Sequence, residues 1–456
     1  MFTIYFNEES SKYQQIYEHI IKEIREKRLL PEERLPSRRA LAEHLGVSLN
    51  TVISAYDQLL EEGYILSRPR SGYFVDRIIA DELHREQREI TEEIPKVQGY
   101  KYNFSHYSLS LHLAPTTVLK RLASQSIEEA VSSENLDDNG YWLLKREVQK
   151  YLQSYRGFTV PMDQIVITGG YRSSLIFLLP LLENKIFVME EPGYTLNETI
   201  FKNTDKKLLK IPVDEYGLSL SHLEKTEASV AIITPNHQFP TGIIMGVRRR
   251  QELLNWAYEK KDRYIIEDDF DSNFKYTGQP IPSLKSLDRH DRVILSGSFS
   301  QVMGSFLRIS YLVLSKTLKE ELDRWELKAV QVPLISQIML QKFLKEGYFA
   351  KHINRVQTHY RRVREEMLNV LKTYPKIKIK GGGVGLYFVL EFLREIPPKE
   401  VIKERAEEQH IFLESVDEYR SKEPYNPGEY IIGFGNIPLS EVRESVKALM
   451  SLFKLP

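Results

Sequence analysis

The stretch Tyr264-Ile265-Ile266-Glu267-Asp268-Asp269-Phe270-Asp271 decides the fold class of this chain, because it joins a short, β-branched apolar run to a cluster of acids. Four further runs have the same apolar character and are bounded by Gly, Pro or Asp: residues 165–167, 186–189, 231–233 and 293–295. Such runs are typical of buried strands in a mostly parallel α/β sheet. Binding sites in these sheets gather at the carboxyl ends of the strands, where the acids lie. Helix capping or a solvated acidic turn would also explain the acids.

The composition describes a large chain without marked charge. With 456 residues, 42% of them hydrophobic, it is long enough for two or three domains. The 63 basic residues balance the 63 acidic ones, so net charge excludes no class of partner and any nucleic-acid site must be local. The absence of Cys excludes disulfides and thiol catalysis. With no signal peptide and no apolar run approaching 18 residues, we expect a cytoplasmic protein that does not span a membrane.

Three segments follow one another along the chain. Residues 1–77 have the pattern of a compact module, and residues 103–456 alternate apolar runs with helical patterns. Residues 78–102 between them are rich in charge and poor in apolar periodicity, which predicts a linker. We therefore expect a small N-terminal domain, a linker and a large α/β domain.

The N-terminal module has the pattern of a helix-turn-helix followed by a hairpin. Apolar residues at helical spacing predict a first helix over residues 12–28. Ser37 and Gly46 are expected to begin and end a second helix, and a third is expected to start at Ser48. Two short strands follow, joined by residues 67–72, which would carry two arginines at the tip of a wing.

This pattern favours DNA binding. The third helix would enter a major groove with its N-terminal residues, while arginines before it and on the wing would hold phosphates or reach base edges. The candidate DNA-binding residues are Arg38, Arg39, Ser48, Asn50, Thr51, Arg68 and Arg70. The alternative is a small structural domain, because residues 1–77 hold eleven basic and twelve acidic residues and so lack a positive balance.

Two segments of the large domain combine groups that bind anions. Thr168-Gly169-Gly170-Tyr171-Arg172 follows a predicted strand and opens a helix, so its glycines and free N–H groups would admit an anion. Ser298, Ser300 and Arg308 could hold a phosphate, the arginine through charge-assisted hydrogen bonds. An ordinary strand-to-helix turn would explain the first segment equally well. The 11 histidines show no spacing typical of a metal site.

These segments resemble known families. Residues 35–42, 47–52 and 59–65 are similar, in order and spacing, to the GntR-type winged helix-turn-helix. The acidic strand, the Gly-Gly turn, Glu191-Pro192-Gly193-Tyr194 and residues 298–308 together resemble class I pyridoxal-phosphate aminotransferases. A chain that joins the two resembles the MocR family of bacterial regulators. The resemblance implies an N-terminal winged helix-turn-helix and a large aminotransferase-type α/β domain with a smaller C-terminal α+β lobe.

The resemblance also implies a cofactor and partners. Pyridoxal 5′-phosphate would have its phosphate at the Gly170 turn, its ring near Tyr194 and its pyridine nitrogen facing Asp268. The cofactor-binding residues implied in this way are Gly170, Tyr171, Arg172, Tyr194, Asp268, Ser298, Ser300 and Arg308. The family further implies a head-to-tail homodimer, a double-stranded DNA operator with repeated half-sites and a small-molecule effector.

Four positions depart from the family pattern. Gln301 stands where an aminotransferase has the lysine that forms a Schiff base with the cofactor, and an amide cannot replace it because its nitrogen lone pair is delocalised. Phe270 replaces a tyrosine that donates to the cofactor's phenolic oxygen, and Ser305 stands near a usual proline. Ile431 stands where a substrate-carboxylate arginine is expected. Since three of these changes remove polar groups at one site, they favour natural divergence over an isolated change at Gln301.

Three hypotheses follow. The first is a DNA-binding transcriptional regulator whose aminotransferase-like domain senses an effector and binds the cofactor non-covalently or not at all. The second is a working aminotransferase with an accessory DNA-binding domain, which Gln301 opposes because it leaves no catalytic lysine. The third is a DNA-bound scaffold whose large domain binds no small molecule. We favour the first and expect transamination to be lost.

Overall fold

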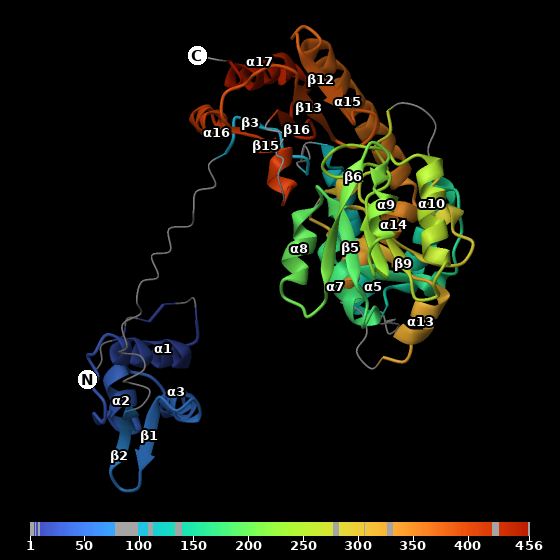
Figure 1. Cartoon of the computed structure of the whole chain (residues 1–456). Coiled ribbons are helices and arrows are strands. Elements are labelled where there is room, and N and C mark those ends of the chain that lie inside the picture. The colour runs from blue at the N-terminus through green and yellow to red at the C-terminus, as the bar shows by residue number, and fades with distance from the viewer. Residues whose placement is uncertain are drawn as a thin grey trace. The chain divides into compact units, whose positions relative to one another are not determined.

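The computed structural model divides the chain into two compact units, Met1–Val97 and Gln98–Pro456 (Figure 1). It describes residues 4, 6–7, 10–77, 99–107, 113–132, 139–276, 282–304, 306–325, 332–421 and 428–454. Most of the expected linker, residues 78–98, lies outside the described residues, as does Ser305. The domain boundaries at residues 77 and 103 therefore stay predictions.

The first unit contains a three-helix domain with a hairpin. Its elements are α1 (Lys12–Arg25), α2 (Arg38–Leu45), α3 (Leu49–Glu61), β1 (Ile65–Arg68) and β2 (Gly72–Val75). Ser37 and Ser48 cap α2 and α3, each accepting a backbone hydrogen bond at 3.2 Å, and Gly46 ends α2 in the left-handed conformation. The apolar faces of the three helices meet in one core, which the antiparallel hairpin closes. The predicted winged helix-turn-helix is confirmed, with α1 ending at Arg25 rather than at residue 28.

The second unit is built on a mixed eight-stranded sheet with the order β4-β11-β10-β9-β8-β5-β6-β7. Neighbouring strands from β10 to β6 in this order are parallel, whereas β11 and β7 are antiparallel to their neighbours. The strands are β4 (Ile165–Thr168), β5 (Phe187–Glu191), β6 (Leu208–Asp214), β7 (Gly217–Leu218), β8 (Val230–Ile233), β9 (Tyr264–Asp269), β10 (Val293–Ser298) and β11 (Ser310–Val313). All five predicted strands are confirmed, and so is the α/β fold class.

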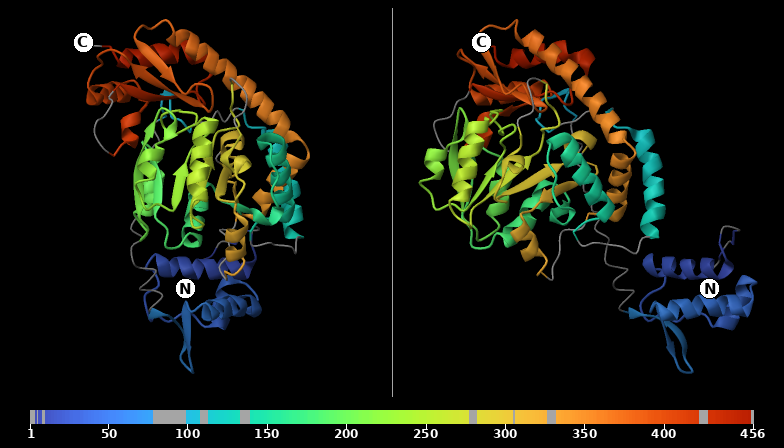
Figure 2. Two further views of the ribbon diagram at one scale, coloured as in Figure 1. Left: turned by 45° about the vertical axis from the view of Figure 1, so that its right-hand side comes forward. Right: turned by 90° about the vertical axis from the view of Figure 1, so that its right-hand side faces the viewer.

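Helices cover both faces of this sheet, because buried apolar side chains alternate along each strand (Figure 2). Ile266 of β9 faces one set of helices, and Ile265 faces the opposite set. The first face is covered by α7 (Tyr171–Leu181), α8 (Thr195–Phe201) and α13 (Lys316–Leu322). The opposite face is covered by α6 (Trp142–Arg156) and α10 (Val247–Tyr258), with α14 (Leu334–Lys345) packed against α6 and α5 (Thr116–Val131) packed against α14.

A smaller lobe forms the C-terminal part of the unit, coloured orange to red in Figure 2. Its antiparallel sheet has the order β12-β13-β16-β15. Its elements are β12 (Ile377–Lys380), β13 (Tyr387–Phe392), α16 (Lys399–Glu408), β14 (Ile411–Phe412), β15 (Glu414–Ser415), β16 (Glu429–Gly433) and α17 (Val442–Leu452). The long helix α15 (Tyr348–Leu371) contacts both α14 and α17, and β3 (Tyr102–Asn103) pairs with β14. The expected α+β lobe is therefore confirmed.

Candidate functional site

The acids of β9 alternate between the two faces of the main sheet. The sequence predicts that the strand ends at Ile266, but β9 continues through Glu267, Asp268 and Asp269. Since consecutive strand residues point to opposite faces, Asp268 faces one side and its two neighbours face the other. Asp268 lines a pocket at the carboxyl ends of β5, β8 and β9, together with Tyr171 of α7 and residues of these strands. Open α/β sheets bind their ligands at this edge.

The Asp268 carboxyl is available to a ligand. Asp268 is 8% exposed, and within the described residues its carboxyl group takes part in no hydrogen bond or ion pair. Burial raises the pKa of Asp268 well above its usual range, and the carboxyls of Asp269 and Asp271 raise it further. The Tyr171 hydroxyl in the same pocket donates to Oδ1 of Asn197 at 2.8 Å. A buried acid without a donor is costly, so this pocket favours a ligand that brings one.

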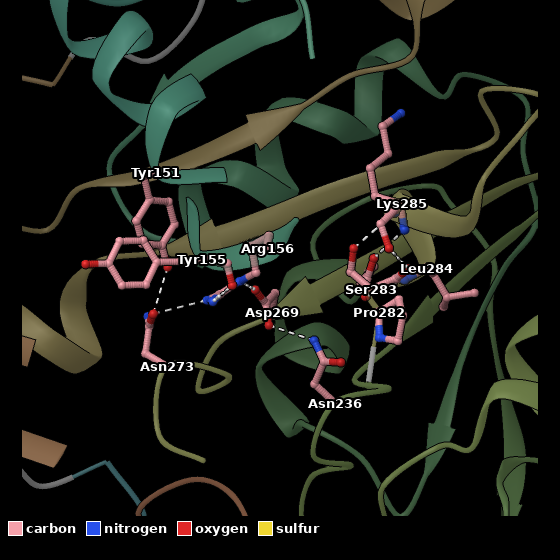
Figure 3. A network of polar contacts seen from close by, with 12 residues as sticks. Tyr151, Tyr155, Arg156, Asn236, Asp269, Asn273, Pro282, Ser283, Leu284 and Lys285 are labelled. Carbon is pink, nitrogen blue, oxygen red and sulfur yellow. Dashed lines mark hydrogen bonds and ion pairs between the residues drawn. The ribbon is translucent and has the colours of Figure 1, made fainter. Parts of the chain in front are cut away.

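On the opposite face, Asp269 anchors a network of buried polar side chains (Figure 3). It accepts hydrogen bonds from Nε of Arg156 and from Nδ2 of Asn236, both at 2.7 Å. Arg156 also donates to the Asn273 side chain at 3.2 Å, which accepts from the Tyr151 hydroxyl at 2.8 Å. The network thus ties helix α6 and the Asn236 loop to the strand end that carries the Asp268 pocket.

Glu267 belongs to a second part of this buried network. It accepts hydrogen bonds from the backbone N–H groups of Leu284 and Lys285 at 3.0 and 2.9 Å, and it lies 3.8 Å from Nη1 of Arg250. Burial raises the pKa of Glu267 to about 7. Arg250, also buried, donates to Oδ1 of Asn236 at 3.0 Å. Asn236 is therefore held from both sides, by Arg250 and by Asp269.

The predicted anion-binding residues gather around the start of α7. Gly170 precedes the helix with a φ of +99°, and a Cβ atom there would lie 3.2 Å from Nη2 of Arg308. Only Gly tolerates both this backbone conformation and so close a guanidinium. Burial raises the pKa of the Tyr194 phenol, as does Asp268, while the charges of Arg172 and Arg308 oppose this rise. Two guanidinium groups and the free N–H groups of α7 therefore lie near the Asp268 pocket.

The remaining two anion-binding candidates lie at the end of β10. Oγ of Ser298 accepts a hydrogen bond from the Ser300 backbone N–H at 3.1 Å, which shapes the turn into α12 (Ser300–Met303). Gln301 follows in this short helix and does not line the Asp268 pocket. It lines a separate pocket with Met303, Phe306 and three residues of α15, His352, Val356 and Tyr360, and within the described residues its buried Oε1 has no hydrogen-bond partner. The expected Schiff-base position is therefore an amide in a mostly apolar pocket apart from Asp268.

The departures at Phe270 and Ile431 belong to one apolar cluster. Ile431 of β16 is fully buried and packs with Phe239 and Tyr387. Phe270 and Tyr194 pack against the same cluster. The position at which a substrate carboxylate was expected to meet an arginine is therefore occupied by aliphatic and aromatic side chains.

Sequence reasoning missed three polar residues of the Asp268 pocket: Glu190, Asn197 and Thr234. Glu190 directly precedes the quoted Glu191-Pro192-Gly193-Tyr194 segment, which was a signal that this strand end belongs to the site. Thr234 directly follows the predicted strand at residues 231–233, and Asn197 lies three residues after Tyr194, but nothing in either segment marked these two side chains as part of a site.

Three of the predicted DNA-binding residues are exposed, and among the described residues of the first unit their side chains have no hydrogen-bond or ion-pair partner: Arg39 on α2, Asn50 on α3 and Arg70 in the hairpin turn. Ser48 and Thr51 begin α3, where Oγ of Ser48 lies 2.8 Å from Oγ1 of Thr51. These two hydroxyls therefore also serve as the helix cap.

The other two predicted DNA-binding arginines, Arg38 and Arg68, contact protein groups. Nη1 of Arg38 lies 3.7 Å from Asp57, and its guanidinium stacks on the Tyr73 ring. Arg68 lies on β1, 3.6 Å from Glu32 and over the Phe74 ring. The expectation of two arginines at the wing tip is wrong for Arg68, because β1 extends two residues beyond the predicted strand and leaves Arg70 alone in the turn.

Comparison with known proteins supports both units. Residues 12–75 match the model of the bacterial regulatory proteins of the gntR family, and residues 108–422 match that of the class I and II aminotransferases. The uncharacterized HTH-type transcriptional regulator YdeL of Bacillus subtilis is 33% identical, over 97% of each chain. The probable rhizopine catabolism regulatory protein MocR of Rhizobium meliloti is 29% identical, over 97% of this chain and 93% of that protein.

Among solved structures, an archaeal alanine:glyoxylate aminotransferase superposes with a TM-score of 0.68 at 24% identity, covering 78% of this chain and 91% of that one. This similarity concerns the fold alone, which is that of a pyridoxal-phosphate-binding family. In the part of the chain that the structure describes, no helix is long and apolar enough to cross a membrane. The full-length relatives are regulators, which supports the regulator hypothesis over the aminotransferase alternative. The chain belongs to the MocR family of DNA-binding transcriptional regulators, in which a GntR-type winged helix-turn-helix is joined to an aminotransferase-like domain.

Proposed function

We propose that this regulator binds a phosphorylated pyridine of the pyridoxal-phosphate class without a covalent bond, and that binding changes its affinity for a DNA operator. The observation that carries the proposal is the buried carboxyl of Asp268, which has no hydrogen-bond or ion-pair partner among the described residues and lies in a pocket near Arg172 and Arg308. A ligand with a basic ring nitrogen and a phosphate ester matches both kinds of charge. The amide of Gln301 excludes a Schiff base at this position.

In this proposal, Asp268 accepts a hydrogen bond from the ring nitrogen, and Tyr194 lies against the ring. The phosphate is held by N–H groups at the start of α7 and by the side chains of Arg172, Ser298, Ser300 and Arg308. When held by a lysine, pyridoxal phosphate supplies an electron sink for amino-acid chemistry. With an amide at position 301 and Ile431 in an apolar cluster, this chain would bind its ligand and not transaminate it.

For the first unit, we propose that α3 enters the major groove of operator DNA. Asn50 would read base edges, and the N-terminal N–H groups of α3, capped by Ser48 and Thr51, would contact a phosphate. The arginines proposed to contact the backbone are Arg38, Arg39, Arg68 and Arg70. Exposure of Arg39 and Arg70 supports this role most directly, whereas Arg38 and Arg68 would have to exchange an acidic partner for a phosphate.

We further propose a head-to-tail homodimer that acts in the cytoplasm on operators with repeated half-sites. Membership of the family supports this arrangement. A ligand can change operator affinity only if it binds two arrangements of the dimer with different strength. The proposed effector site must therefore differ between the DNA-bound and free forms.

A titration of the full chain with pyridoxal phosphate, followed by absorbance and by calorimetry on the same samples, tests the ligand proposal. We expect heat of binding without the absorption band of a Schiff base. Asp268→Asn and Arg308→Gln should each weaken binding, whereas Arg289→Gln, at an exposed arginine away from the pocket, should not. Gln301→Lys should add the band and allow borohydride trapping.

Two outcomes would contradict the proposal. A Schiff-base band in the wild-type chain would show that another amine takes the place of the lysine. No heat of binding would favour the scaffold hypothesis, in which the large domain binds no small molecule. To test the regulatory step, DNA fragments that the wild-type chain binds are first enriched from a random library. The affinity of the full chain for these fragments is then measured with and without the ligand.

A further inference from the structure

The Asp268 pocket contains a second buried acid, Glu190, at the end of β5. Glu190 is 4% exposed. Its Oε2 accepts hydrogen bonds from the backbone N–H of Thr234 at 3.0 Å and from the Thr234 hydroxyl at 2.7 Å. Its Oε1 is buried and, within the described residues, has no hydrogen-bond partner. Nε2 of Gln238 donates to the carbonyl oxygens of Pro192 and Phe239 and is no hydrogen-bond partner of Oε1, although the Gln238 amide lies close enough to Glu190 to lower the pKa of its carboxyl.

No positive charge compensates the two acids within the pocket lining. The described residues that line the pocket include Tyr171, Tyr194, Asn197 and Thr234 but no Lys, Arg or His. Glu190 and Asp268 are close enough for the charge of one to raise the pKa of the other, yet no hydrogen bond joins them in the described structure. Two carboxyl groups therefore face one small space, and each lacks a donor there. Buried acceptors of this kind are normally paired.

A simple pyridine cannot satisfy both acids. Its ring nitrogen offers at most one N–H, and the neighbouring ring positions of pyridoxal phosphate carry a methyl group and a hydrogen. A ring with an amino group beside the protonated nitrogen offers two or more N–H donors along the same edge. Such an edge offers each of two adjacent carboxyl groups a donor, and its single positive charge is complementary to them in sign.

We propose that this pocket recognises the phosphate ester of an amino-substituted nitrogen heterocycle, with Asp268 and Glu190 each accepting a hydrogen bond from its N–H edge. The proposal rests on the proposed function for the phosphate end of the site, near Arg172 and Arg308, and narrows the class of ligand. Glu190 then acts as a specificity residue that distinguishes amino-substituted rings from methyl-substituted rings.

Two synthetic probes test the proposal: (6-aminopyridin-3-yl)methyl phosphate and (6-methylpyridin-3-yl)methyl phosphate. They differ only in the group beside the ring nitrogen. Calorimetry with the full chain should give a Kd at least about tenfold lower for the amino probe, as expected for one additional charge-assisted hydrogen bond. Titration with pyridoxal phosphate on the same preparation reports separately on the proposed function.

Glu190→Gln should remove the preference for the amino probe. The Kd of the methyl probe should stay within about threefold of its wild-type value, a smaller change than the loss of one hydrogen bond would cause. The two donors of Thr234 would hold the amide oxygen, so the substituted side chain would turn its NH₂ group towards the ligand. Glu191→Gln is the matched control, because the neighbouring carboxyl accepts from the Ser421 backbone N–H instead of lining the pocket. It should keep the preference.

Equal binding of the two probes by the wild-type chain would overturn the proposal, and pyridoxal-phosphate binding in the same experiment would then leave the proposed function intact. A preference that survives Glu190→Gln would also overturn it, because another group would then be reading the amino substituent. Failure of all three phosphates to bind would remove the proposed function together with this inference.

Discussion

Removal of Arg156 should cost the second unit far more stability than removal of an exposed arginine with the same ion-pair distance. Nε of Arg156 lies 2.7 Å from Oδ2 of Asp269, and the two side chains are 9% and 0% exposed. In Arg156→Met, the Asp269 carboxylate keeps, among the described residues, only the hydrogen bond from Asn236 and stays beside other buried acids. Breaking a buried pair by removing one partner costs about 3–5 kcal/mol.

Arg443 provides the matched control. Its Nε also lies 2.7 Å from a carboxylate oxygen, that of Glu366, but these side chains are 76% and 30% exposed. Arg443→Met should cost about 1 kcal/mol or less, because solvent screens an exposed pair. Urea unfolding followed by tryptophan fluorescence measures both variants. All three tryptophans, at 142, 256 and 325, belong to the second unit, so the signal reports on that unit.

Equal losses in the two variants would refute the assignment of Arg156 as the counter-ion of Asp269. A double-mutant cycle with Asp269→Asn gives a second check. Arg156→Met should cost less in the Asp269→Asn background, because no buried carboxylate is then left without its cation. Additive losses would mean that Arg156 stabilises the unit through packing alone.

Four further predictions concern single residues. Burial raises the pKa of Glu190 from 4.5 to about 7, so its protonated form stabilises the fold below pH 4.5 and this contribution is lost as pH rises through 7. In urea unfolding, the stability of Glu190→Gln relative to wild type should therefore rise by up to about 3 kcal/mol from pH 5 to pH 8. A stability difference that does not change with pH would contradict this. Ser48→Ala should lower the free energy of unfolding of the first unit by about 1 kcal/mol, measured by circular dichroism. An unchanged value would show that another group caps α3. Arg70→Ala should weaken binding to the enriched DNA fragments and reduce the salt dependence by about one phosphate contact, so an unchanged slope would remove Arg70 from the interface. Ile431→Arg should cost about 3 kcal/mol or more in urea unfolding rather than create a carboxylate site, and wild-type stability would show that the cluster admits water.

The strands could be predicted because each is a short apolar run whose alternate residues pack on opposite helices. The limit of this reasoning is visible in β9. Acidic residues predict the end of a buried strand, yet Glu267 and Asp269 continue it because Arg250 and Arg156 neutralise them from α10 and α6. Arg156 lies 113 residues from Asp269 in the chain, so no local pattern could have indicated the pairing.

Site residues could be predicted where they belong to a recognisable sequence motif. They were missed where their role depends on a contact with a residue far away in the sequence. The Gly170 turn and Asp268 belong to recognisable segments, and the structure brings both to the same sheet edge. Glu190 was missed because its partner Thr234 is 44 residues away and because an unsatisfied Oε1 is a property of packing. The hairpin shows the same limit, since strand length alone moved Arg68 from the expected tip to β1.

The loss of stability caused by a buried polar group in the Asp268 pocket argues that this pocket binds a ligand. Phe270 and Ile431 stand at two positions where the family resemblance implies a polar group, and both belong to an apolar cluster that stabilises the fold without any ligand. Asp268 is different, because a buried carboxyl without a donor destabilises the protein in which it stands. A domain that served only as a scaffold would be more stable with Asn or Leu at this position. Asp268→Asn should therefore raise the stability of the ligand-free chain while it weakens ligand binding. A loss of stability in the ligand-free protein would show instead that Asp268 has a structural role, and the argument for a ligand would then rest on Glu190 and on Arg172 and Arg308.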